Sequence, residues 1–117
     1  MNSEELRERT KKFALLIIEL AAKLPNTPAG KVISYQLIKA GTSVGANYRS
    51  ACRGRSKAEF NSKLHIVLEE SDESVFWLEL IIESKLLPIE EVTPILSEAQ
   101  ELTAIFAKSF YTAKRSL

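Results

Sequence analysis

The sequence predicts an all-α protein, an antiparallel up-down-up-down four-helix bundle. Apolar residues recur at alternating steps of three and four along four long segments, which is the spacing of one helix face. No segment has the strict alternation of a strand. Prolines and glycines separate the segments by short connections, and short connections make neighbouring helices antiparallel. The chain, residues 1–117, is expected to form a single domain.

The first helix is expected to end before Pro25, because a proline lacks the amide that a helix interior needs. Asn2 and Glu5 resemble a capping box, which satisfies free amides at a helix start. Its seam is apolar except for one threonine, and consists of Leu6, Thr10, Phe13, Ile17, Leu20 and Leu24.

The second helix is predicted from about Pro28 to about Cys52, with Thr27 as its N-cap. Gly41 and Gly45 weaken a helix, so we expect them to allow close approach of a neighbour. Two stripes run along this helix. The apolar stripe is Leu37, Gly41, Val44, Tyr48 and Ala51, and the small, polar stripe is Gln36, Ala40, Ser43, Asn47 and Ser50.

The third helix is expected to begin at a second capping box, Ser56 with Glu59, and to run to about Ser84. Its expected apolar face is Phe60, Leu64, Val67, Leu68, Ser71, Val75, Leu78 and Ile82. Residues 88–92 are expected to form one turn, and Thr93-Pro94 to restart the fourth helix. The fourth seam is Ile95, Ala99, Leu102, Phe106, Phe110 and Ala113.

Charge is unevenly distributed, although the net charge is only +1. Residues 1–63 hold 12 Lys/Arg and 5 Asp/Glu, whereas residues 64–107 hold 1 and 10. Two interpretations remain open. Oppositely charged helices pair within one compact body, or the segregation serves recognition of a partner.

Several functional classes lack support in the sequence. No apolar run is long enough to cross a membrane, no basic start precedes an apolar stretch, and a cytoplasmic location is expected. A di-iron bundle needs two Glu-x-x-His pairs, but the single histidine, His65, follows Ser62 at that spacing. Cys52 is the only cysteine, and no histidine lies near it in sequence to act as a base. We therefore expect no enzymatic activity, no metal and no cofactor.

Acidic residues of the third helix form a block inside an otherwise apolar run: Glu69, Glu70, Asp72 and Glu73. Like charges one turn apart destabilise a helix, so a cation on the second helix, Lys39 or Arg49, is expected to compensate them. The hypothesis is a polar layer that fixes helix register or subunit contact; the alternative is an acidic ligand pocket. The proposed layer comprises Gln36, Lys39, Ser43, Asn47, Glu69, Glu70 and Glu73.

Basic residues gather where the second helix meets the third. This basic corner, a candidate nucleic-acid site, comprises Arg49, Arg53, Arg55, Lys57 and Lys63. Lysine and arginine side chains neutralise backbone phosphates, which supplies affinity without sequence preference. Tyr48 and Phe60 lie nearby but belong to apolar stripes, so we expect both rings to be buried rather than available for stacking on a base.

Two runs, Ser43-Val44-Gly45-Ala46-Asn47-Tyr48-Arg49 and Ser56-Lys57-Ala58-Glu59-Phe60, are followed by Lys63, Glu69-Glu70, Asp72-Glu73 and Trp77-Leu78-Glu79-Leu80. With these motifs the chain resembles the bacterial four-helix-bundle proteins of the 23S rRNA intervening-sequence family, in the branch that reads Asn-Tyr-Arg. The resemblance implies a left-handed bundle and a ring-shaped homopentamer. A similar bundle is the accessory variability protein of diversity-generating retroelements, which engages nucleic acid.

The resemblance and the basic corner together predict a non-enzymatic homo-oligomer that binds RNA or a ribonucleoprotein partner. The alternative is an oligomeric scaffold for protein interactions with no nucleic-acid role, in which a positive face of one subunit meets a negative face of the next.

Overall fold

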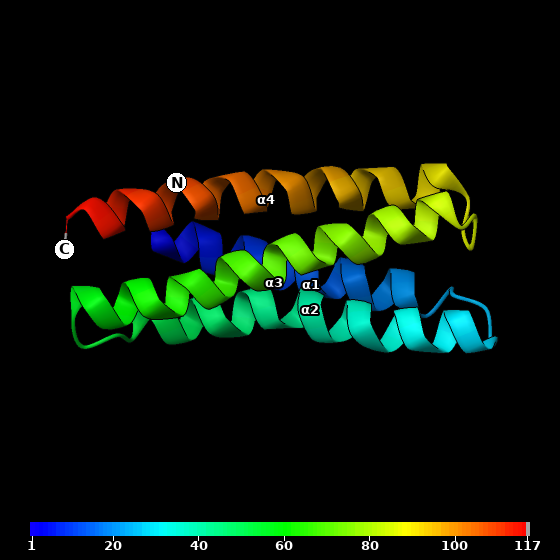
Figure 1. Ribbon diagram of the computed structural model, residues 1–117, viewed down its shortest axis with the longest axis horizontal. Helices are drawn as coiled ribbons and strands as arrows, with labels where there is room; N and C mark the ends of the chain where they lie inside the picture. Colours follow the sequence, from blue (N-terminus) through cyan, green and yellow to red (C-terminus); the bar gives the residue numbers. More distant parts are fainter. Residues whose placement is uncertain (117) are drawn as a thin grey trace.

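The computed structural model describes residues 1–116, and most of them lie in four helices (Figure 1). The helices are α1 (Ser3–Ala21), α2 (Pro28–Cys52), α3 (Lys57–Glu83) and α4 (Ile89–Arg115). No strand occurs in these 116 residues, so the predicted all-α class is confirmed. The body measures 45 × 20 × 19 Å, close to the length of a 27-residue helix at about 1.5 Å per residue.

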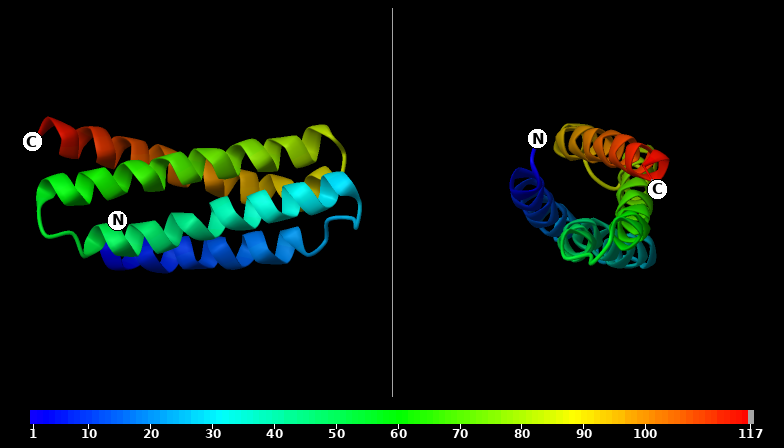
Figure 2. Two further views of the ribbon diagram at one scale, coloured as in Figure 1. Left: turned by 60° about the horizontal axis from the view of Figure 1, so that its bottom comes forward. Right: turned by 90° about the vertical axis from the view of Figure 1, so that its left-hand side faces the viewer.

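Each helix lies beside the next helix in the chain, and the chain turns back at each connection (Figures 1 and 2). The α2–α3 seam is the most extensively packed, followed by the α3–α4 and α1–α2 seams. The α1–α4 seam is much sparser. Helix α1 is therefore attached to the bundle mainly through α2.

Helices α1, α2 and α3 begin where the sequence predicts because their N-caps are satisfied. The side chains of Asn2, Thr27 and Ser56 each accept a hydrogen bond from the amide three residues later, at 2.8, 3.1 and 3.1 Å. Each bond satisfies one of the amides that a helix start leaves without a partner. The predicted bounds of the second helix, Pro28 and Cys52, are confirmed.

The fourth helix differs from its prediction. A restart at Thr93-Pro94 was expected, but α4 is continuous from Ile89 and contains Pro94 in its interior. Pro94 lacks only the amide that would bond to the carbonyl of Glu90, one turn into the helix. The loss of one hydrogen bond so near the helix start is smaller than the cost of breaking the seam that continues into Ile95.

The core follows the predicted seams closely in α1 and α2. All the residues predicted for the α2 apolar stripe are buried, and so is the α1 seam from Leu6 to Leu20. Thr10 fits there because its hydroxyl donates to the carbonyl oxygens of Leu6, at 2.8 Å, and Arg7, at 3.1 Å. A polar side chain in this seam needs no partner on another helix.

The α3 seam lies slightly to one side of the predicted face. Phe60, Leu68, Val75 and Ile82 are half-buried, at the margin of the core. The fully buried seam is Leu64, Val67, Ser71, Ser74, Leu78 and Ile81, an unbroken three-four repeat. Serine at position 74, which the predicted face lacks, hides this repeat from a reading of apolar residues. Ser71 shares a 2.7 Å hydrogen bond with Thr103 of α4, and the Ser74 hydroxyl donates to the carbonyl of Glu70.

Candidate nucleic-acid interface

The basic corner is built by the connection between α2 and α3. Arg53 is the C-cap of α2 and Ser56 the N-cap of α3. The carboxylate of Glu59 accepts a 3.4 Å hydrogen bond from the amide of Arg55, while the Glu59 amide donates to Ser56. This tight corner leaves the side chains of Arg53, Arg55 and Lys57 exposed to solvent at one end of the bundle.

The other two predicted members of the basic corner, Arg49 and Lys63, lie outside this exposed cluster and on different sides of the bundle. Arg49 is exposed on the side of α2 that faces α1. Lys63 is half-buried and precedes Glu70 by seven residues, which puts both on the same side of α3. That side faces α2, because Glu70 lies against Ser43. Arg49 therefore lies on the α1 side of α2, whereas Lys63 lies on the side of α3 that faces α2, so the two do not form one patch.

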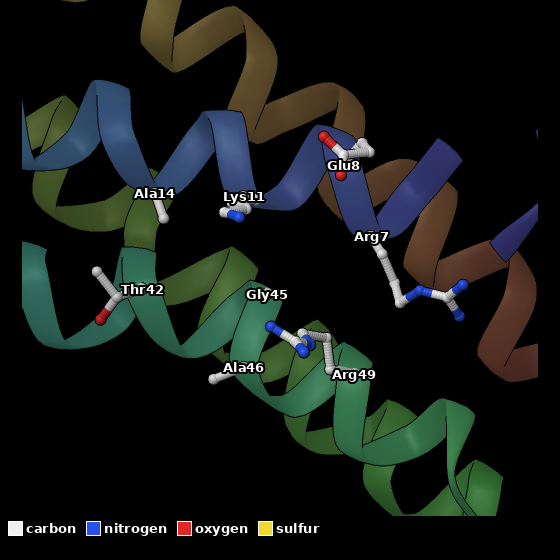
Figure 3. Close-up of a pocket in the computed structure, with 8 residues that line it drawn as sticks. All are labelled: Arg7, Glu8, Lys11, Ala14, Thr42, Gly45, Ala46 and Arg49. Atoms are coloured by element: carbon white, nitrogen blue, oxygen red, sulfur yellow. The ribbon is translucent and has the colours of Figure 1, made fainter. Parts of the chain in front are cut away.

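Arg49 instead lines a groove together with two cations of α1, Arg7 and Lys11, which no sequence pattern singled out. An open groove of about 420 Å³ runs between α1 and α2, near the end that carries the basic corner (Figure 3). In Figure 3 the Arg7 side chain leaves α1 on the side of α2 and its guanidinium then turns away from Arg49, while the Arg49 guanidinium lies over α2. We call this the α1–α2 groove; its charged lining residues are Arg7, Glu8, Lys11 and Arg49.

Cations on the two sides of α1 have different surroundings. Arg9, which faces α4, donates two hydrogen bonds of 2.8 and 2.7 Å to Glu98 and lies 2.9 Å from Glu101. These hydrogen bonds raise the pKa of Arg9 further above its already basic value. Within residues 1–116, by contrast, no carboxylate lies within 4 Å of the charged nitrogens of Arg7, Lys11 or Arg49. The α1–α2 groove thus carries positive charge without a paired counter-charge.

The predicted polar layer is present in part, between Lys39 and Ser43 of α2 and Glu70 of α3. Burial raises the pKa of Glu70, and the neighbouring Glu73 raises it further. The Ser43 hydroxyl and Lys39 act in the opposite direction. Lys39 is therefore the α2 cation that acts on the acidic block, because its charge lowers the pKa of Glu70. Arg49, the other cation expected for this role, lies on the α1 side of α2 instead.

The remaining members of the predicted layer make other contacts. The Asn47 side chain donates to the carbonyl of Ser43 at 2.9 Å, and Glu73 accepts a 3.3 Å hydrogen bond from the indole of Trp77. Gln36 is half-buried on α2. Glu69 is exposed and pairs with His65 at 3.2 Å on another face of α3. Of the predicted layer, the residues that lie together are therefore Lys39, Ser43 and Glu70.

A pH-dependent effect is expected at Glu70. Since its pKa is raised on folding, the folded protein holds the proton more tightly than the unfolded chain. The stability contributed by protonated Glu70 is fully present below the unfolded pKa, about 4.3, and is lost as the pH rises through the folded value.

We expect Glu70→Gln to raise the melting temperature at pH 7 and to have little effect at pH 3.5. Thermal melts followed by circular dichroism measure this. Glu79→Gln, at an exposed site on the same helix, is the control; an equal response of the two variants contradicts the assignment.

The two residues considered for catalysis have separate surroundings. His65 is exposed and its ring lies 5.0 Å from that of Phe110. Cys52 is half-buried beside Tyr48. Burial, followed by the hydrogen bond with Cys52, raises the Tyr48 pKa to about 12. In residues 1–116 no three His, Cys, Asp or Glu side chains are grouped closely enough to hold a metal ion, and none of the helices is long and apolar enough to cross a bilayer.

Comparisons with known proteins agree with this architecture. A solved structure of a protein of unknown function from the S23 ribosomal protein family of Bacteroides thetaiotaomicron is 33% identical in sequence. The similarity covers 89% of this chain and 96% of that chain, with a TM-score of 0.82. No curated protein matches. Residues 3–108, which include α1, α2, α3 and most of α4, match the family described as 23S rRNA-intervening sequence protein. The chain therefore belongs to the 23S rRNA-intervening sequence protein family.

Proposed function

We propose that this protein is a non-enzymatic, homo-oligomeric bundle that binds structured RNA through its basic corner. The observation that carries the proposal is the exposure of Arg53, Arg55 and Lys57 at one end of the bundle. These side chains project from a connection that is fixed by the capping of Ser56 and Glu59. Backbone phosphates favour such a cluster because each bound cation releases condensed counterions from the nucleic acid.

The distribution of charge over the helices supports the same proposal. Helix α2 contains three Lys/Arg and no Asp/Glu, whereas α3 carries the acidic block. An RNA strand is therefore attracted to the α2 side and repelled from the outer face of α3. An almost neutral chain can bind RNA in this way, because the local charge of the contact surface governs phosphate binding.

Charge reversal at the basic corner tests the proposal. We expect the variant R53E/R55E/K57E to lose measurable retention of a labelled structured RNA in filter binding at low salt, while the unchanged protein retains it. Binding by the unchanged protein should weaken steeply as salt rises. The three side chains are exposed, so the variant should keep its helical circular dichroism. Retention of RNA by the unchanged protein no better than by a neutral control protein would refute RNA binding.

A second candidate, an oligomeric scaffold without a nucleic-acid role, is favoured by a different observation. Large apolar side chains remain exposed on the outer surfaces, among them Tyr35 at 66%, Val32 at 58% and Phe76 at 53%. Assembly covers such side chains, and opposite charges on α2 and α3 suit contacts between unlike faces, which close into rings when the rotation permits. Light scattering decides this part: a monomer at every salt and protein concentration excludes both the scaffold and the oligomeric part of our proposal.

Finer features of the family resemblance also belong to the proposal. We infer an up-down-up-down order of helices with a left-handed supercoil, a pentameric ring, and a relation to the accessory variability protein of diversity-generating retroelements. The strict three-four repeat of the α3 seam supports the left-handed supercoil, because a repeat of 3.5 residues drifts against a straight helix and is accommodated by left-handed winding.

A further inference from the structure

The α1–α2 groove has features that the basic corner lacks. Its cations come from two helices, Arg7 and Lys11 from α1 and Arg49 from α2, and all three line the same open groove (Figure 3). Arg7 is half-buried, which restricts the positions its guanidinium can occupy. Cations held in a concave, partly fixed arrangement contact a phosphate at a lower entropic cost than flexible side chains at a corner.

Close helix packing shapes the groove. Gly45 of α2 lies against Thr10 of α1, where an added Cβ would be only 3.3 Å from the threonine hydroxyl oxygen. The lining residues Ala14, Thr42 and Ala46 are also small, so the floor stays open. The groove therefore has an open floor between two closely packed helices that both carry cations.

The charge balance of the groove favours an anion. Glu8 is the one carboxylate among its lining residues, against three cations. In Figure 3 the Glu8 carboxylate lies on the side of α1 away from α2. Within residues 1–116, Arg7, Lys11 and Arg49 form no ion pair, whereas Arg9 of α1 and Lys23, just beyond the end of α1, are paired with carboxylates of α4.

We propose that the α1–α2 groove is a phosphate-binding site that holds the RNA backbone between Arg7 and Lys11 on one wall and Arg49 on the other. This inference rests on the proposed function, RNA binding at the adjacent basic corner. The corner attracts the strand and the groove fixes its position, so the contact surface extends from the α2–α3 connection along α1 and α2.

Neutralisation of the groove tests the inference against a control with the same loss of charge. The test variant is R7Q/K11Q/R49Q, and the control is K12Q/K85Q/K108Q, which removes three exposed cations outside both the groove and α2. Affinity for the labelled structured RNA is measured over a range of KCl concentrations. We expect the test variant to bind about tenfold or more weakly at low salt and the control to stay within about twofold of the unchanged protein. The slope of log K against log salt should become shallower by about 2 in the test variant, since each phosphate contact contributes about 0.7 to 0.9.

A second pair of variants serves if the triple substitution impairs folding. Ala46→Glu places a carboxylate at the rim of the groove, one turn from Arg49, and Ala104→Glu makes the same change at an exposed site on α4. Both positions tolerate glutamate, a good helix former. We expect only Ala46→Glu to weaken RNA binding, by about tenfold.

The possible outcomes separate this inference from the proposed function. Equal affinities of groove variants and their controls, with RNA still bound through the basic corner, would overturn the groove and leave the proposed function standing. Loss of RNA binding in the groove variants, with R53E/R55E/K57E unaffected, would support phosphate binding in the groove and exclude the basic corner as an RNA-binding site. Absence of RNA binding by the unchanged protein would overturn both.

Discussion

Gly41→Ala is expected to lower the free energy of unfolding by about 2 kcal/mol, although alanine is the better helix former by about 1 kcal/mol. An added Cβ would lie 2.7 Å from both Cγ1 and Cγ2 of Ile17 on α1. Ile17 is completely buried, so it has no free space into which to move. The clash must therefore push α1 and α2 apart along the seam that attaches α1 to the bundle. Urea unfolding followed by circular dichroism measures the effect.

Gly45→Ala is the matched control, one turn further along the same helix. Its added Cβ would meet atoms of Thr10 at 3.3 to 3.4 Å, a tight contact that a small adjustment relieves. We expect the gain in helix propensity to offset most of this cost, so that stability changes by less than about 1 kcal/mol. In the Gly41→Ala background, Ile17→Ala should cost less than it does alone, because it removes the clashing carbons. Equal stabilities of the two glycine variants would contradict the close packing at Gly41.

Arg9→Met is expected to destabilise the protein by roughly 1 to 3 kcal/mol. Arg9 bridges α1 to Glu98 and Glu101 across the most sparsely packed seam of the bundle. The side chains of Arg9 and Glu98 are only 20% and 24% exposed, so removing the cation leaves a partly buried carboxylate without its partner. Methionine keeps the aliphatic length, which limits the loss of packing. Chemical denaturation measures the change.

Lys23→Met provides the comparison for Arg9→Met at the other end of the same seam. The Lys23–Glu91 pair spans 3.6 Å, and its side chains are 54% and 39% exposed. Exposed pairs of this kind contribute little, so we expect a change below about 1 kcal/mol. Glu98→Leu combined with Arg9→Met should restore part of the lost stability, because no unpaired carboxylate then remains at that position. If Lys23→Met costs as much as Arg9→Met, the bidentate pair is not the main link between α1 and α4.

The fold was predictable from local signals. The caps at Asn2, Thr27 and Ser56 follow from residue type and spacing alone, and the α2 apolar stripe follows from helical periodicity. Two local predictions were wrong for identifiable reasons. Pro94 suggested a helix start, but one missing amide does not outweigh a continuous seam. Ser74 concealed the true α3 seam because a buried serine whose hydroxyl bonds its own helix looks polar in sequence.

The candidate site was predictable only in part, because it depends on how the helices pair. The corner residues Arg53 and Arg55 are neighbours in sequence, so their cluster is visible there. Arg7 and Arg49 lie 42 positions apart and line one groove only because α1 packs against α2 at Gly41 and Gly45. The register that pairs Arg9 with Glu98 is likewise a property of the packed helices.

The most direct test of RNA binding by the α1–α2 side of the bundle is ultraviolet crosslinking of the unchanged protein to the structured RNA, followed by mass spectrometry of the linked peptides. We expect linked peptides from residues 7–11 of α1 and from residues 49–57, which contain the groove cations and the basic corner. Linked peptides confined to the acidic stretch of α3, residues 69–73, or no linked peptides above those of a neutral control protein, would contradict it.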